Sequence, residues 1–145
     1  MIKTEKEYLE AKSRLANEQK VIADQKIKLK KAELTKDQIK LAIDPLSSFM
    51  LQLKEEITEY EKLKRGEFGD LINLYGIGRT LVALRIFKGI KQSELASKLV
   101  VKESQVSRDE SNDYHGASIE KIQKVLDALG VTLKTKVEIQ YKDVG

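Results

Sequence analysis

The first 34 residues carry a narrow apolar seam along an otherwise polar stretch. The segment has no Gly or Pro and is rich in Lys, Glu, Ala, Leu and Gln, which are good helix formers. The seam residues recur every seven positions, as in a coiled coil: Tyr8, Leu15, Ile22 and Leu29. Because the seam is narrow and is interrupted by Glu18 and Gln25, the pattern predicts one arm of a helical hairpin rather than a free zipper.

The next amphipathic stretch supplies the second arm. Thr35 followed by Gln38 forms a capping-box pattern, which predicts a short helix. Asp44 and Pro45 predict a second helix start, because proline at the first helical position lacks an amide hydrogen that would be unpaired there anyway. The helix that follows carries a broad apolar stripe: Leu46, Phe49, Met50, Leu53, Ile57, Tyr60 and Leu63. Residues 1–65 are therefore predicted to form an antiparallel helical hairpin with a short kinked connection.

A cluster of glycines, from Gly66 to Gly78, marks a junction after the hairpin. Residues 66–130 form the second predicted domain. Within it we expect a short helical or extended piece near 71–74, a helix over about 79–88 and another over about 118–130.

Between these helices, residues 90–116 have the pattern of two short helices joined by a four-residue connection. Leu95, Ala96 and Leu99 fall on one face of the first helix. Val106 is the corresponding apolar residue of the second, and polar side chains surround it. Two short helices crossed through a tight turn form a helix-turn-helix, whose second helix enters the DNA major groove.

The tail changes period after Gly130. Apolar and polar residues alternate over eleven positions, which is typical of a strand with one buried face. The residues of that face are Val131, Leu133, Thr135, Val137, Ile139 and Tyr141. Because a lone strand is unstable and no second strand is evident, we expect residues 131–145 to pair with the same strand of a second subunit.

The net charge of the chain says little about its function, but the charge is unevenly distributed along the sequence. The net charge is +4, from 27 basic and 23 acidic residues, which is too small to indicate a nucleic-acid binder by itself. Residues 1–35 carry nine basic and six acidic side chains. Residues 102–113 carry two basic and four acidic ones, so the second short helix is net negative.

Other residue types exclude several classes of protein. The absence of cysteine excludes disulfides and thiolate chemistry, and the only histidine, His115, lies in a polar turn. We therefore expect no catalytic residues, no metal site and no cofactor. No apolar run approaches the roughly 20 residues of a membrane span. The charged N-terminus lacks the apolar core of a signal peptide, which predicts a cytoplasmic protein without a membrane partner.

Residues 79–130 resemble the helix-turn-helix family of phage repressors, Cro-type proteins and XRE-like bacterial regulators. The likeness lies in LRIFKGIKQSELASKL and VKESQVSRDESNDY, at Leu84-Arg85, Gly89 to Gln92, Glu94 to Ala96, Gln105 to Arg108 and Glu110. It implies a mainly α fold in which the hairpin precedes a five-helix Cro/repressor-type domain, and a C-terminal strand pairs across a dimer. Some members of the wider family are antitoxins.

The resemblance also implies which residues bind DNA. They are Gln92, Ser93, Lys102, Glu103, Ser104, Gln105, Ser107, Arg108 and Asn112. Gln92 would bind a phosphate at a helix N-terminus, with Lys102 and Ser107 as further backbone contacts. Glu103, Ser104 and Arg108 match the base-reading positions. Arg108 is the best candidate for a bidentate bond to guanine, worth about 1–3 kcal/mol of discrimination.

Two positions depart from the family pattern. Val100 stands where the family usually has Gly, and a left-handed backbone there would cost a β-branched residue about 1–2 kcal/mol. Asp109 stands where the family often has an apolar residue. Because a buried, unpaired carboxylate is not tolerated, Asp109 must be exposed or paired.

The sequence leads to two compatible hypotheses. The first is a homodimeric, sequence-specific transcription regulator, acting as a repressor, whose two reading helices lie about 34 Å apart on a pseudo-palindromic site in double-stranded DNA. The alternative is an antitoxin or other interaction module that binds a toxin or another protein through the hairpin or the C-terminal strand. It rests on the long amphipathic N-terminal half, which a minimal repressor does not need.

Overall fold

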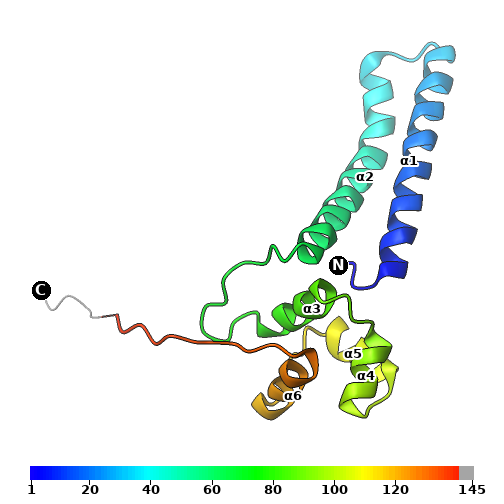
Figure 1. Cartoon of the computed structure of the whole chain (residues 1–145). Coiled ribbons are helices and arrows are strands. Elements are labelled where there is room, and N and C mark those ends of the chain that lie inside the picture. Colours follow the sequence, from blue (N-terminus) through cyan, green and yellow to red (C-terminus); the bar gives the residue numbers. More distant parts are fainter. Residues whose placement is uncertain (141–145) are drawn as a thin grey trace, which may run out of the picture.

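The computed structural model describes residues 1–140 and contains six helices in this part of the chain. They are α1 (Glu5–Lys31), α2 (Lys36–Lys64), α3 (Ile77–Phe87), α4 (Gln92–Leu99), α5 (Glu103–Ser111) and α6 (Ile119–Leu129). Figure 1 shows α1 and α2 as a long antiparallel hairpin that stands on the cluster of α3 to α6. The predicted mainly α fold is confirmed.

Both arms of the hairpin begin at a capping box. Thr4 and Glu7 cap α1, and Thr35 and Gln38 cap α2 as the sequence predicts. The buried residues of α1 lie on its seam side, and those of α2 lie on its apolar stripe: Ala11, Ile22, Ile43, Leu53, Ile57, Tyr60 and Leu63. Packing between these two faces holds the arms together.

The predicted restart at Asp44 and Pro45 is wrong. Pro45 lies inside α2, which runs without a break for 29 residues. Proline removes one backbone hydrogen bond and crowds the preceding turn, but α2 packs along α1, and Ile43 before the proline and Leu53 after it are buried. This packing outweighs the local helix-breaking preference, so the hairpin turns at residues 32–35 instead.

The domain after the hairpin has four helices, α3 to α6, and the predicted fifth helix is wrong. Residues 66–76 form an irregular linker, in which Gly66 and Gly76 have φ values of 80° and 79°. Ile72, Leu74 and Tyr75 are exposed, so no buried face is available to stabilise a helix there. The core of the domain is formed by residues at most 1% exposed: Leu81, Val82, Leu95, Val106 and Val125.

The hairpin is joined to the domain by the first residues of the chain as well as by the linker. Ile2 is buried in the common core. The Lys3 carbonyl accepts a hydrogen bond of 2.7 Å from Arg85 Nη2, and Lys3 Nζ donates to the Glu110 carbonyl. The base of the hairpin is therefore fixed against α3 and α5.

The predicted C-terminal strand is not formed among the described residues. Residues 131–140 have no regular secondary structure and run away from the helices (Figure 1). Val137 is 85% exposed and Ile139 is 71% exposed. Residues 1–140 contain no strand that could satisfy the backbone groups of this segment. Tyr141 lies outside the described residues.

Candidate DNA-binding site

Helices α4 and α5 pack directly against each other through a tight turn. Leu95 and Ala96 of α4 and Val106 of α5 are at most 3% exposed, as the sequence predicts. Val100 ends α4 with φ 58° and ψ 44°, which is the left-handed conformation expected if it replaces glycine. The Val101 amide then donates to the Ala96 carbonyl at 3.0 Å and closes the turn.

A buried ion pair holds α3, α4 and α5 together. Arg85 is 3% exposed and Glu110 is 0% exposed. Arg85 Nη2 donates to Glu110 Oε2 at 2.8 Å, and Arg85 Nε donates to Glu110 Oε1. Gln92 Nε2 donates to the same Oε2 at 2.7 Å, and Arg85 Nη1 donates to the Ile90 carbonyl at 2.8 Å. The carboxylate thus accepts three hydrogen bonds, from Arg85 Nε, Arg85 Nη2 and Gln92 Nε2, which compensate for the cost of its burial.

Sequence reasoning noted Arg85 and Glu110 as matching residues but did not pair them. The available signal was two opposite charges at positions where the helical period places core residues. The family resemblance predicts that Gln92 binds a phosphate. In the structure its side chain is half-buried and donates to Glu110. Its role toward DNA stays a prediction.

The starts of α4 and α5 share an unusual feature. Their N-cap residues are Lys91 and Lys102, and neither helix has a side-chain cap. Threonine or serine side chains cap α1, α2 and α6, and α3 begins at Gly76 without a side-chain cap, so the lysine N-cap is what sets α4 and α5 apart. A lysine at the positive end of a helix is unfavourable, and no capping side chain accepts from the first backbone amides of α4 or α5. This arrangement suits a bound anion, because the amides and the lysine can both interact with it.

The exposed face of α5 carries most of the predicted DNA-binding residues. Its exposed members are Lys102, Glu103, Ser104, Arg108 and Asn112, while Gln105 and Ser107 are half-buried. Glu103 lines one cavity of about 480 Å³ together with Gln92 and Ser93 of α4, so the starts of the two helices adjoin. Asn112 is the C-cap of α5, at the opposite end of a nine-residue helix about 13 Å long.

Neighbouring side chains hold Arg108 and Asp109 in place. Arg108 Nη2 donates to Gln105 Oε1 at 3.1 Å, and Gln105 Nε2 donates to Asp109 Oδ1 at 3.0 Å. Lys121 Nζ of α6 lies 2.7 Å from Asp109 Oδ2. The prediction that Asp109 is exposed or paired is thereby confirmed.

The fold also neutralises the acidic character of this region. Of its four carboxylates, Asp109 pairs with Lys121, and Glu110 pairs with Arg85. Asp113 lies 3.3 Å from Arg79 Nε and 4.0 Å from Lys3 Nζ. Glu103 is the one acid of α5 without an ion pair to the residues that the structure describes. The net negative charge seen in the sequence is therefore not a net negative surface on α5.

Comparison with known families agrees with this geometry. The helix-turn-helix family matches residues 81–135, from within α3 to beyond α6. Residues 81–135 are a helix-turn-helix domain of the XRE type. No curated protein and no solved structure shows significant similarity to the chain.

The matched family indicates the general activity of this segment. It is a DNA-binding family associated with transcription regulation. The match leaves the hairpin and the linker outside, so these parts are additions to the common domain. No helix among residues 1–140 is long and apolar enough to cross a membrane.

Proposed function

We propose that the protein is a cytoplasmic, homodimeric transcription repressor that binds a pseudo-palindromic operator through α5. The observation that carries this proposal is the pair of uncapped helix starts at Lys91 and Lys102, beside the exposed face of α5. In a repressor they would receive two backbone phosphates and so orient α5 in the major groove.

The residues of the two helices divide into two roles. Gln92, Ser93, Lys102 and Ser107 contact the DNA backbone and set the position of the domain. Ser104 and Arg108 read base edges, with Glu103, Gln105 and Asn112 beside them. The bond from Arg108 to Gln105 holds the guanidinium in place, which reduces the entropy lost on binding guanine.

The C-terminal segment supplies the dimer contact in this proposal. Residues 131–140 expose alternating apolar side chains and pair with no strand in the part of the chain that the structure describes. Pairing with the same segment of a second copy would satisfy the backbone groups of both and bury these side chains. A twofold dimer then presents two α5 helices about 34 Å apart, on one side of the duplex.

Footprinting on the DNA upstream of the gene for this protein tests the proposal. We expect a protected palindrome, with affinity that falls as salt rises, because phosphate contacts release counterions. Arg108→Ala should weaken operator binding by about 5- to 150-fold and relax specificity at one base pair per half-site. Lys102→Ala should weaken binding to every sequence about equally.

Lys40→Ala is the matched control, because it removes one exposed lysine in the first turns of α2, near the turn of the hairpin. It should leave the footprint and the affinity unchanged. Absence of a protected site, together with salt-independent binding, would contradict the proposal.

The hairpin is the candidate site for a second function, the binding of a partner protein. It lies outside the helix-turn-helix match and exposes several leucines and isoleucines: Leu9, Ile27, Leu41 and Leu51. A toxin or other partner stays a prediction, tested by co-purification of the full chain with the product of the adjacent gene. A hairpin variant with Leu41→Ser and Leu51→Ser should lose the partner and keep operator binding.

A further inference from the structure

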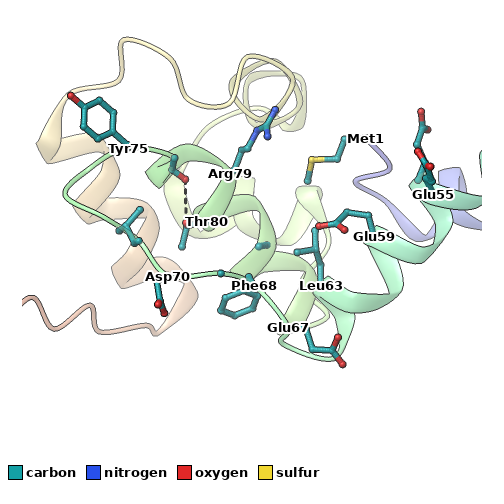
Figure 2. Close-up of a pocket in the computed structure, with 15 residues that line it drawn as sticks. Met1, Glu55, Glu59, Leu63, Glu67, Phe68, Asp70, Tyr75, Arg79 and Thr80 are labelled. Carbon is teal, nitrogen blue, oxygen red and sulfur yellow. Dashed lines mark hydrogen bonds between the residues drawn. The ribbon is translucent and has the colours of Figure 1, made fainter. Parts of the chain in front are cut away.

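A cavity of about 630 Å³ lies where the hairpin, the linker and α3 meet. Its walls come from Met1, the last turns of α2, residues 67–76 and the first turns of α3, as Figure 2 shows. This volume falls within the range of about 300–1,000 Å³ that is usual for sites of small organic ligands.

Apolar side chains form much of the lining. They are Met1, Leu63, Phe68, Leu71 and Ala83. Leu63 is 6% exposed and Ala83 is 3% exposed, so they belong to the core at the bottom of the cavity. The Phe68 ring is held edge-on against Phe87, with ring centroids 6.0 Å apart. An apolar lining of this kind favours the apolar part of a ligand.

Carboxylates stand at the edge of the cavity on the side of α2. Glu55, Glu56 and Glu59 line it, and none forms an ion pair with the residues that the structure describes. Glu55 and Glu59 are four residues apart on one helix, an arrangement of like charges that destabilises a helix by a few tenths of a kcal/mol. A contribution to helix stability therefore does not explain why Glu55 and Glu59 stand at these positions.

The positive charge that lines the cavity does not neutralise these residues. Arg79 is directed to Asp113, at 3.3 Å. Glu67, which also lines the cavity, already pairs with Arg65 at 2.8 Å. The cavity thus combines an apolar bottom with a negative edge, so the complementary ligand has an apolar body and a positive charge.

We propose that this cavity binds a small organic cation with an aromatic or aliphatic body. The body packs on Leu63, Phe68 and Ala83, and the charge lies beside Glu55 and Glu59. The inference is independent of the DNA-binding proposal, because none of these residues belongs to α4 or α5.

Fluorescence anisotropy of the full chain with rhodamine 6G, an aromatic cation, tests this site. Fluorescein, which shares its ring system and is an anion, is the ligand control. We expect saturable binding of rhodamine 6G, weaker in high salt, and no binding of fluorescein. The double variant Glu55→Gln and Glu59→Gln should bind rhodamine 6G at least tenfold more weakly. It should fold at least as well as the unmodified chain, because a repulsive pair is removed.

The matched control variant is Asp24→Asn and Asp44→Asn, which removes the same charge from exposed sites on the hairpin away from the cavity. It should bind rhodamine 6G normally. The proposal is overturned if the cation does not bind, if both dyes bind equally, or if the two double variants lose the same affinity.

Discussion

Glu110 holds a carboxylate at 0% exposure, surrounded by Arg85 and Gln92. Removing one partner of a buried pair leaves the other charge unpaired, so we expect Glu110→Ala to lower the free energy of unfolding by about 3–5 kcal/mol. Urea denaturation of the purified variant measures this. Glu103→Ala, on the exposed face of the same helix, should change stability by less than about 0.5 kcal/mol. Equal effects of the two variants would show that the ion pair is not required for stability.

Val100 presents a second effect at the scale of one residue. It is 90% exposed and has φ 58°, so its side chain adds strain without packing. Val100→Gly should raise the free energy of unfolding by about 1 kcal/mol, because glycine removes the left-handed penalty but gains more entropy when unfolded. Thermal unfolding measures the gain. Val101→Gly, at a neighbouring position without a positive φ, should lower stability instead.

At the scale of an element, Pro45 is a weak point of α2. It supplies no amide hydrogen within a 29-residue helix. Pro45→Ala should stabilise the hairpin by about 1–3 kcal/mol, since alanine restores the hydrogen bond and relieves the crowding. The far-ultraviolet circular dichroism melt should shift upward. Ala42→Pro, three residues earlier in the same helix, should do the reverse.

The base of the hairpin carries a pH-sensitive contact. Tyr60 is 5% exposed and donates to Glu5 Oε2 at 3.1 Å. Burial, reinforced by this bond to a carboxylate, raises the pKa of Tyr60 from 10.0 to about 12. The folded state therefore holds this proton more tightly than the unfolded state does, and its contribution to stability is present below pH 10 and is lost as the pH rises toward 12.

Tyr60→Phe tests this contact, because phenylalanine keeps the ring and has no proton to lose. Its melting temperature should fall less than that of the unmodified chain between pH 9 and pH 11.5. Part of the fall should remain, because burial also raises the pKa of Tyr114. Parallel pH curves for the two proteins would contradict the assignment to Tyr60.

At the scale of the whole molecule, the proposed dimer depends on the tail. Val137→Lys together with Ile139→Lys places charges on the alternating apolar face, so we expect the dimer to dissociate to monomers and lose cooperative operator binding. Light scattering after size-exclusion chromatography gives the mass. Thr132→Lys with Gln140→Lys adds the same charge to the polar face and should remain dimeric. A monomeric unmodified chain at all concentrations would rule out this dimer.

Periodicity and capping residues were sufficient to predict much of the fold. The capping box at Thr35, the apolar faces of both hairpin arms and the paired short helices around Val100 all depend on neighbours within a few residues. Where the prediction failed, a distant contact decided. α2 passes through Pro45 because of its packing on α1. Residues 66–76 stay irregular because the side chains of Ile72, Leu74 and Tyr75 are exposed and give a helix no buried face.

The candidate site divides in the same way. The sequence by itself determined the helix-turn-helix, its apolar skeleton and the polar residues along α5, because helical periodicity places them. Only the tertiary structure decided which charged side chains in this region form ion pairs. It brings Lys121 to Asp109, Arg79 to Asp113 and Arg85 to Glu110, from helices at least 12 residues away in sequence. Such pairs depend on how whole helices pack, which local patterns of residues do not encode.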